Sequence, residues 1–421
     1  MLKDSLIKRY FSKASSNIIR FLLSLITLGM IPKSLGPEDY GRFGYLNLFY
    51  GRLIQFLDFG FSTAIITKLS KRQKEKKLLN FYIIFIFCQL LFTIFITYVI
   101  NYTSLSNYVI PNVNKEIIYL VMLLSVAVAF SKSIIKINDI YGFTVNNEIY
   151  LIIKNVIFTI LIILLYINST LNLKSFIILS ALLTIFIILT GYYNLKTNDI
   201  NIISNLAINK KELIKYTNEF LIFSKPLIIV SFIIFFSTIL DRWLIQNFYD
   251  PKDQGIYNLC LNICNAIFLL TSSMIPLLHR EISFEQKKSR IERIYKNYGF
   301  IFFFITSFIC VFIGNWSDDI IEIIFGDLYK SASSILPLMC FYTIYRVKSN
   351  FAIVYFYAFE KTQTYKRFNT ISYLIAIPLV LFLVGPSEYL GLQMGIFGLV
   401  LKLIIIQHIL YLLMGNSISK H

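Results

Sequence analysis

The chain has 421 residues, of which 57% are hydrophobic, 16% aromatic and 15% charged. A soluble chain carries about a quarter charged residues, whereas the apolar residues here fall in blocks of roughly twenty, enough to cross a hydrocarbon core of about 30 Å. This composition excludes a soluble globular domain, so the net charge of +17 is interpreted by its position relative to a membrane and not as a nucleic-acid surface.

In chain order, the apolar blocks predict an all-α integral membrane protein with about twelve transmembrane helices. The first block ends without a small-residue cleavage site and is interpreted as an uncleaved span, not a signal peptide. An even number of spans places both termini on the same side of the membrane. The predicted spans are 15–33, 43–66, 79–100, 117–137, 148–167, 174–194, 219–241, 255–278, 297–316, 333–357, 368–385 and 391–414.

Basic residues between the predicted spans set the orientation. Of the 40 Lys and Arg residues, 26 fall on the side of the N-terminus, seven on the opposite side and seven within spans. Cytoplasmic connections carry the excess of Lys and Arg in membrane proteins, so both termini are predicted to be cytoplasmic. Trp243 and Trp316 fall at predicted outer helix ends, where indole rings are favoured. The seven outer-side residues are Lys33, Arg42, Lys115, Lys174, Arg242, Lys252 and Lys330.

The two halves of the chain repeat each other. Transporters built from parallel repeats place their site at the interface of the repeats. We therefore predict two pseudo-symmetric six-helix lobes, with residues 1–195 as the N-terminal lobe, 196–218 as a cytoplasmic linker and 219–421 as the C-terminal lobe. A constant shift of 214 residues pairs Pro37 with Pro251, Asp39 with Asp253 and Gly41 with Gly255.

Several charged side chains lie inside the predicted spans. A lone cation at the bilayer centre costs about 2.5–3.5 kcal/mol and is usually hidden in a bundle or a wet cavity. Asp58 is the clear mid-span anion, interpreted either as a coupling group or as the ion-pair partner of a neighbouring Arg. The excess of positive charge favours a phosphate-bearing substrate, because Arg donates paired, charge-assisted hydrogen bonds. The candidate cavity cations are Arg20, Arg52, Arg346, Lys348 and Lys402.

Polar residues recur at helical spacing in three of the spans, which places each group on one helix face. Such faces are expected to point toward a polar interior. Two alternatives stay open: Arg20 is near enough to the cytoplasmic end to snorkel, and the asparagines are suited either to interhelical hydrogen bonds or to sugar hydroxyls. The groups are Ser16, Arg20, Ser24 and Thr27; Arg52, Gln55, Asp58 and Ser62; and Asn258, Asn262, Asn265 and Ser272.

Cysteine and histidine give no sign of a metal or cofactor. The five cysteines all lie inside apolar blocks without the spacing of a metal knuckle, and the three histidines are far apart. No metal, cofactor or nucleic-acid partner is therefore predicted.

Short motifs in both halves carry a family resemblance. They are residues 35–41 (LGPEDYG), 43–45 (FGY), 57–60 (LDFG), 255–257 (GIY) and 323–326 (IIFG) followed by Tyr329. In their order and spacing the chain resembles the polysaccharide-export branch of the multidrug/oligosaccharidyl-lipid/polysaccharide superfamily, and within it the Wzx-type O-antigen flippases. The resemblance covers nearly the whole length.

The resemblance implies a fold and a function. The fold is a MATE-like, V-shaped pair of lobes that alternates between inward-open and outward-open states. The substrate is an undecaprenyl-diphosphate-linked oligosaccharide, the O-antigen repeat unit of lipopolysaccharide biosynthesis, moved to the periplasmic leaflet of the bacterial inner membrane. An O-antigen polymerase and a chain-length regulator are the implied partners. Family members carry functional cations in the central cavity, a part that the five candidate cations are expected to play.

Two other functions compete with this interpretation. A cation-coupled multidrug exporter of the same fold would place acidic residues in its cavity, where Asp58 alone stands out. A membrane glycosyltransferase or O-antigen polymerase would need catalytic groups in a sizeable outer loop, and the longest one, residues 316–331, has four acids without a companion histidine or arginine cluster. Neither alternative explains the buried positive charge.

Overall fold

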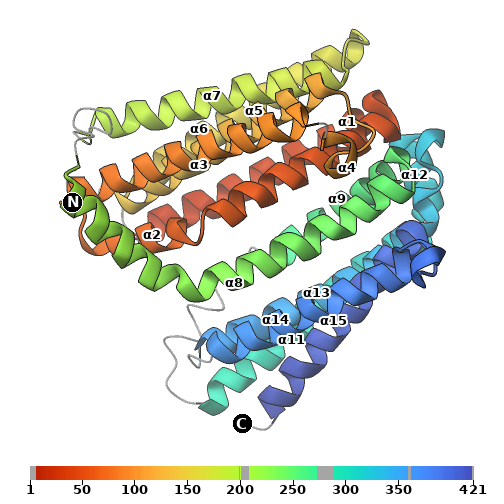
Figure 1. Cartoon of the computed structure of the whole chain (residues 1–421). Coiled ribbons are helices and arrows are strands. Elements are labelled where there is room, and N and C mark those ends of the chain that lie inside the picture. Colours follow the sequence, from red (N-terminus) through yellow and green to blue (C-terminus); the bar gives the residue numbers. More distant parts are fainter. Residues whose placement is uncertain are drawn as a thin grey trace. The chain divides into compact units, whose positions relative to one another are not determined.

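The computed structural model describes residues 6–103, 105–198, 200, 208–272, 288–358 and 362–419, in which the regular elements are helices. Figure 1 shows them as long rods. Within these ranges eight helices are long and apolar enough to cross a membrane, or nine if the bent pair of α11 and α12 counts as one span. The chain is thus an all-α, multi-pass membrane protein as predicted, while the number of twelve spans stays a prediction.

The helices follow the predicted spans closely in their order. The first eight are α1 (Leu6–Leu57), α2 (Phe61–Lys71), α3 (Lys76–Tyr102), α4 (Ser106–Val109), α5 (Lys115–Ile140), α6 (Thr144–Ile167), α7 (Leu173–Lys196) and α8 (Lys210–Phe248). The others are α9 (Pro251–Ser272), α11 (Lys288–Asn315), α12 (Ser317–Phe325), η1 (Asp327–Tyr329), α13 (Ala332–Ala358), α14 (Thr362–Val384), η2 (Ser387–Tyr389) and α15 (Gly395–Ser419).

The chain divides into two compact units. Unit 1 comprises residues 1–35 and 42–239, and unit 2 comprises residues 36–41 and 240–421. The division falls inside α8, so it follows packing and not the repeat. The predicted lobe limits therefore stay a proposal. Residues 199 and 201–207 of the predicted linker lie outside the described residues.

The helical backbone breaks once between the first two predicted spans and once inside the second. Gly36 has φ 72° and ψ 165°, a left-handed backbone that glycine adopts without steric cost, and it kinks α1 between the spans. A second break separates α1 from α2, where Phe59 and Gly60 have φ of 49° and 81°. The predicted single span 43–66 is therefore wrong in its second part, because the helix ends at Leu57 and a new one begins at Phe61.

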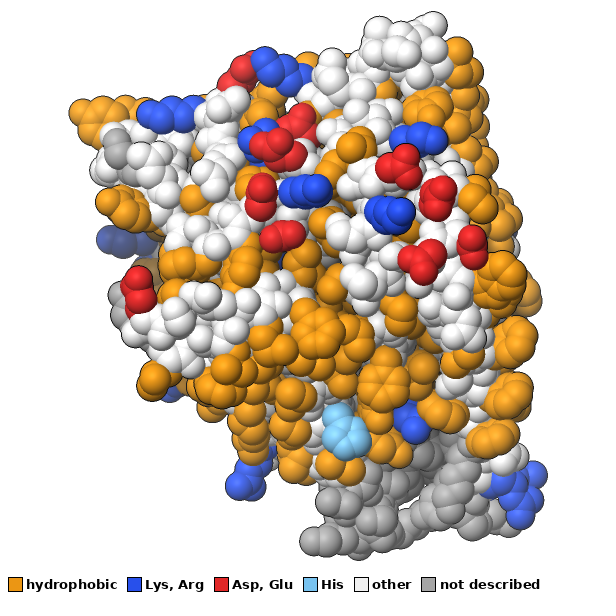
Figure 2. Space-filling view, turned by 90° about the vertical axis from the view of Figure 1, so that its right-hand side faces the viewer, with side chains coloured by type: hydrophobic (Ala, Val, Ile, Leu, Met, Phe, Trp, Pro, Cys, Tyr) orange, Lys and Arg blue, Asp and Glu red, His pale blue; other side chains and the backbone are white. Residues whose placement is uncertain are grey.

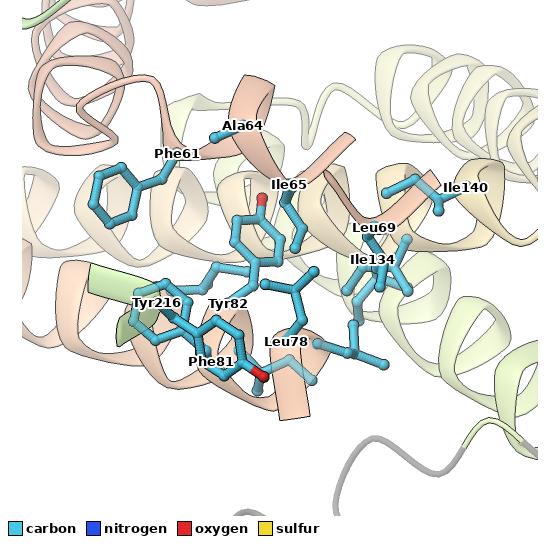
Figure 3. Close-up of a cluster of buried hydrophobic side chains, with 14 of the residues drawn as sticks. Phe61, Ala64, Ile65, Leu69, Leu78, Phe81, Tyr82, Ile134, Ile140 and Tyr216 are labelled. Atoms are coloured by element: carbon cyan, nitrogen blue, oxygen red, sulfur yellow. The ribbon is translucent and has the colours of Figure 1, made fainter. Parts of the chain in front are cut away.

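Unit 1 has a core of aromatic and aliphatic side chains from α2, α3, α5 and the start of α8. Figure 3 shows Tyr82 and Leu78 of α3 beneath Ile65 of α2, with Tyr216 of α8 beside Phe81. Tyr82, Leu78 and Ile65 are fully buried. These side chains are apolar where the helices meet. Their burial therefore holds the start of α8 against the other helices of this core.

A network of ion pairs, here named the α8 network, lies beside this core. Glu219 accepts hydrogen bonds from Arg72 and, at 2.8 Å, from Lys68. Arg72 also pairs with Glu75 at 3.3 Å, and Glu75 accepts a hydrogen bond from the Tyr216 hydroxyl at 2.5 Å. The basic residues of the predicted connection 68–77 therefore bind the acidic first turns of α8.

We expect Glu219→Gln to lower the free energy of unfolding by about 1 kcal/mol, because the partly exposed carboxylate holds two cations. Burial raises the pKa of Glu219, but the hydrogen bonds from Lys68 and Arg72 lower it by more, so it lies below its usual 4.5. The stabilisation is thus complete at neutral pH and is lost as the pH falls through the folded-state pKa, below about 4.5. Thermal unfolding of the purified protein at pH 7 and at about pH 3 measures this.

The matched control for that variant is Glu388→Gln in η2, an exposed acid for which no ion pair is found among the described residues. It should leave the unfolding temperature unchanged at both pH values. An equal effect of both variants, or an effect of Glu219→Gln that is undiminished at about pH 3, would contradict the role assigned to the α8 network.

In unit 2 the two copies of the repeated motif meet each other. A Cβ atom on Gly41 would overlap the carbonyl oxygen of Pro251, and one on Gly255 would overlap the carbonyl oxygen of Pro37. The shift of 214 residues exchanges these two contacts, because it relates Gly41 to Gly255 and Pro37 to Pro251. The contact is therefore reciprocal, as between two repeats related by a pseudo-two-fold axis.

Large hydrophobic side chains lie exposed on the surface. Phe95 of α3 is 57% exposed and Phe308 of α11 is 69% exposed. Figure 2 shows many such side chains on the face that it presents, with acidic and basic side chains gathered elsewhere on it. Such a surface is stable in contact with lipid tails and not with water, which agrees with a membrane-embedded chain.

Candidate functional site

Arg20 lies on α1 in unit 1 and is paired with a buried acid. Its Nη2 atom is 3.3 Å from Glu148 Oε2 on α6, and the Glu148 side chain is only 3% exposed. Arg20 also donates to Asn17 Oδ1. Sequence reasoning missed Glu148 because the predicted span began there, whereas α6 starts one turn earlier at Thr144. The charge of Arg20 is thus compensated.

Arg52 and Gln55 line a pocket between α1 and α8. Arg52 Nη1 donates to Gln55 Oε1 at 2.8 Å. The pocket is small and open to its surroundings, and Ser231 supplies a hydroxyl from α8. Among the described residues, no acid forms an ion pair with Arg52. A half-buried guanidinium, an amide and a hydroxyl suit an anion, because all three donate hydrogen bonds. The remaining lining residues are Phe56, Ile234 and Phe235.

Asp58 closes the turn between α1 and α2. Its carboxylate accepts hydrogen bonds from the Ser62 amide at 3.2 Å and from the Ser62 hydroxyl at 2.6 Å, and Ser62 lies 3.0 Å from the Tyr82 hydroxyl. Asp58 therefore caps the first turn of α2, and the predicted continuous polar face from Arg52 to Ser62 is wrong beyond Leu57.

The cation near Asp58 is not the predicted arginine. Arg52 binds Gln55, whereas the charge of Lys136 on α5 acts on Asp58. Sequence reasoning passed over Lys136 because it falls at the end of the predicted span 117–137. Whether Asp58 couples the transport cycle to an ion stays a proposal.

Lys402 of α15 lies in a buried ion pair in unit 2. Its Nζ atom is 2.6 and 2.9 Å from the two carboxylate oxygens of Asp241 on α8, and the two side chains are 4% and 11% exposed. Asp241 was expected at the end of span 219–241, but α8 continues to Phe248. Asp58 is therefore not the lone anion within the spans, since Asp241 and Glu148 are buried as well.

Arg242 is buried inside a helix, which corrects its predicted place outside the spans. It was counted among the outer-side topology residues, but it is 4% exposed inside α8. Its Nη1 donates to Gln254 Oε1 at 2.8 Å, the Gln254 amide donates back to the Arg242 carbonyl, and its guanidinium lies 4.1 Å from the centre of the Tyr257 ring. The first two turns of α9 thus supply a hydrogen-bond acceptor and an aromatic ring to a buried arginine.

Arg346 of α13 faces α9. Its Nη1 atom donates to Asn265 Oδ1 at 2.7 Å, and its guanidinium lies 4.0 Å from the centre of the Phe268 ring. Within the described ranges no acid forms an ion pair with it. Arg52 and Arg346 thus share one arrangement, in which an arginine donates to a side-chain amide oxygen and keeps other donors for a ligand.

The three predicted asparagines of α9 have different contacts. Asn265 binds Arg346, and Asn262 donates to the Tyr40 hydroxyl at 2.5 Å. Asn258 is buried, and its Nδ2 atom has no hydrogen-bond partner in the described part of the chain. The side chain of Ser272, the last member of that stripe, lies outside the described residues.

Lys348 is separated from Arg346 although both lie on α13. Its Nζ atom is 3.9 Å from the centre of the Phe303 ring on α11 and 5.1 Å from that of Tyr411 on α15. Residues two apart on a helix do not face each other, which explains why Arg346 meets α9 and Lys348 meets α11 and α15. Unit 2 therefore does not bring Lys348 together with Arg346.

Known proteins resemble the chain in sequence family and in fold. A lipid II flippase MurJ in an inward closed conformation matches 98% of this chain and 87% of its own, with TM-score 0.68 and 17% identity. An inward-facing multidrug resistance MATE transporter of the MOP superfamily matches 96% and 98%, with TM-score 0.67 and 13% identity. A MATE transporter from Vibrio cholerae matches 99% and 97%, with TM-score 0.61 and 11% identity.

These structures show that the predicted MATE-like fold is correct. No curated protein sequence matches the chain. The family described as polysaccharide biosynthesis protein matches residues 6–278, which is more than half of the chain. The family resemblance predicted from the motifs of both halves is thereby confirmed, and the chain belongs to the polysaccharide biosynthesis protein family.

Proposed function

We propose that the chain is a flippase that moves an undecaprenyl-diphosphate-linked oligosaccharide, an O-antigen repeat unit, from the cytoplasmic to the periplasmic leaflet of the inner membrane by alternating access. The observation that carries this proposal is the pair of arginines, Arg52 and Arg346, which bind neutral amides and no described acid. A diphosphate is the anion that such a lipid-linked sugar presents. The family supports a substrate of polysaccharide biosynthesis.

Each polar group has an assigned part in this mechanism. Arg52, with Gln55 and Ser231, binds phosphate oxygens through the donors that its bond to Gln55 leaves unused. Arg346 is the second proposed phosphate contact. Asn258 and Asn262 donate to sugar hydroxyls, while the polyprenyl tail stays in lipid. Both termini are placed in the cytoplasm, and a polymerase and a chain-length regulator are the proposed partners.

Arg20 and Lys402 are assigned differently from the other cations. Each forms an ion pair with a buried acid, Glu148 and Asp241 respectively, so neither has a full charge to offer a phosphate in this conformation. A substrate contact by either one requires that its acid be released first. Their part in binding is therefore proposed for a later stage of the cycle.

A cation-coupled multidrug exporter is the alternative that the MATE similarity raises. Such an exporter needs a carboxylate that is free to bind a cationic drug. Glu148 and Asp241 already have basic partners, and the charge of Lys136 acts on Asp58. The compensated acids and the uncompensated arginines favour an anionic substrate.

The test is flipping of a fluorescent undecaprenyl-diphosphate-linked saccharide in proteoliposomes. We expect Arg52→Gln to reduce the flipping rate roughly tenfold or more, because a charge-assisted hydrogen bond contributes about 1.5–3 kcal/mol. Arg52→Lys should retain part of the rate, since it keeps the charge and loses the fork. Arg346→Gln is expected to have an effect of similar size.

Arg42→Gln is the matched control on the same helix, because Arg42 is bonded to the Asn112 carbonyl and lines no described pocket. It should flip at the wild-type rate. Full activity of both Arg52→Gln and Arg346→Gln, with insertion verified, would remove the basis for diphosphate recognition. Efflux of a cationic dye by the wild type, without flipping, would favour the exporter.

A further inference from the structure

Three helices of unit 2 bring together aromatic side chains and polar groups that can donate hydrogen bonds. We name it the Lys348 cluster, and it consists of Phe303 on α11, Tyr345 and Lys348 on α13, and His408 and Tyr411 on α15. It lies on the opposite side of α13 from the contact between Arg346 and Asn265. The cluster is therefore separate from the proposed substrate contacts.

The ammonium of Lys348 is surrounded by aromatic rings. Its Nζ atom lies 3.9 Å from the centre of the Phe303 ring, 5.1 Å from that of Tyr411 and 6.0 Å from that of Tyr345. The His408 ring meets Tyr345 edge-on, with the ring centres 5.0 Å apart. A cation, an imidazole and two phenols thus lie around one aromatic centre.

None of these polar groups is satisfied within the described residues. The Lys348 ammonium, the Tyr345 and Tyr411 hydroxyls and the His408 imidazole have no hydrogen bond or ion pair there, and only ring contacts are found. His408 is exposed and the others are half-buried. Cation–π contacts stabilise an ammonium but leave its N–H donors free, and unpaired polar groups in an apolar medium are costly.

The cluster opens on a hydrophobic surface. His408 is exposed. Figure 2 shows hydrophobic side chains beside a histidine, with a basic side chain close by. The exposed neighbours include Phe304 and Phe300 on α11, which are 62% and 67% exposed. The medium outside the cluster is therefore lipid.

The cluster lies nearer one end of α13 than the other. Lys348 is ten residues from Ala358 and sixteen from Ala332, and its long side chain can extend toward the nearer end. Basic residues lie at this end of unit 2, among them Arg290, Arg293 and Lys366. Under the positive-inside rule this is the cytoplasmic leaflet.

We infer that the Lys348 cluster binds the phosphate of an anionic glycerophospholipid in the cytoplasmic leaflet. Charge complementarity selects the occupant, since Lys348 supplies the positive charge and the two tyrosines and His408 supply hydrogen bonds to phosphate oxygens. The acyl chains then lie on the exposed phenylalanines of α11. Basic pockets between helices on the cytoplasmic side are typical sites for such headgroups. The inference is independent of the transported substrate.

Native mass spectrometry of the delipidated full chain, titrated with phosphatidylglycerol or phosphatidylcholine, tests it. The wild type should retain phosphatidylglycerol in preference to phosphatidylcholine. Lys348→Gln should weaken phosphatidylglycerol binding about tenfold, and Tyr411→Phe, which keeps the ring, should weaken it by a smaller factor. Lys330→Gln, at the opposite end of α13, is the matched control and should bind as the wild type does.

Thermal unfolding distinguishes a loss of lipid binding from a loss of stability. All variants should unfold at the same temperature in phosphatidylcholine, and phosphatidylglycerol should stabilise the wild type and Lys330→Gln more than it stabilises Lys348→Gln. Equal phosphatidylglycerol affinity of the wild type and Lys348→Gln would overturn the inference. Displacement of the bound lipid by an equimolar amount of undecaprenyl diphosphate would also overturn it, because the cluster would then belong to the substrate path.

Discussion

Replacing Gly255 with alanine is expected to destabilise the protein by about 3 kcal/mol or more. The added Cβ would overlap the Pro37 carbonyl oxygen and lie 2.7 Å from the Pro37 carbonyl carbon, and both are backbone atoms. Backbone cannot turn aside as a flexible side chain does, so α9 and the segment 36–41 must move apart, and such overpacking costs about 1–3 kcal/mol or more. Thermal unfolding in detergent and the amount of protein in the membrane measure the loss.

Two further glycines make this prediction specific. Gly41→Ala should have an effect of the same size, since its Cβ would overlap the Pro251 carbonyl oxygen. Gly299→Ala on α11 is the control, because a Cβ there meets nothing within 4 Å, and alanine favours a helix over glycine by about 1 kcal/mol. If Gly255→Ala were as stable as Gly299→Ala, the close contact of the two motifs would be wrong.

The repeat illustrates what a sequence reveals and what it leaves open. The shift of 214 residues that pairs Gly41 with Gly255 was visible in the sequence and predicted two related halves. It did not predict that the two copies touch, because a repeat gives equivalence and not contact. The structure adds the contact of each glycine with the proline of the other copy. That contact gives a physical reason for glycine at both positions.

Helix positions were largely predictable, and helix ends were less so. Blocks of apolar residues identify segments long enough to cross a membrane, since length and hydropathy alone decide this. The break at Phe59 and Gly60 lies inside one apolar block, where hydropathy does not change. The local sequence Asp58-Phe59-Gly60 does carry a signal, an acid suited to cap a helix two residues before a glycine.

The candidate site was predictable in residue type but not in pairing. Buried cations were identified by their depth, but Glu148 and Asp241 were missed, because they fall at predicted span limits that differ from the helix ends by four to seven residues. The separation of Arg346 from Lys348 could have been predicted from their spacing, since residues two apart lie on different helix faces. Which acid meets which base depends on the packing of α8 against α15, which no local pattern encodes.

The buried ion pair between Lys402 and Asp241 carries the other large expected effect. Lys402→Met alone, or Asp241→Asn alone, should lower the free energy of unfolding by about 3–5 kcal/mol, because each leaves one polar partner buried without its counter-charge. The double variant Asp241→Asn with Lys402→Met should recover most of that loss. Thermal or denaturant unfolding of the four proteins gives the coupling energy of the pair.

An exposed ion pair of the same chemistry is the control for this cycle. Lys174 and Glu116 are 2.7 Å apart, as close as the buried pair, but their side chains are 55% and 63% exposed. Water and salt screen such a pair, so Lys174→Met and Glu116→Gln should show a coupling below about 1 kcal/mol. Burial is thus the variable that separates the two cycles. Equal couplings would mean that water reaches Lys402 and Asp241, and Lys402 would then be available to a phosphate without first losing its acid partner.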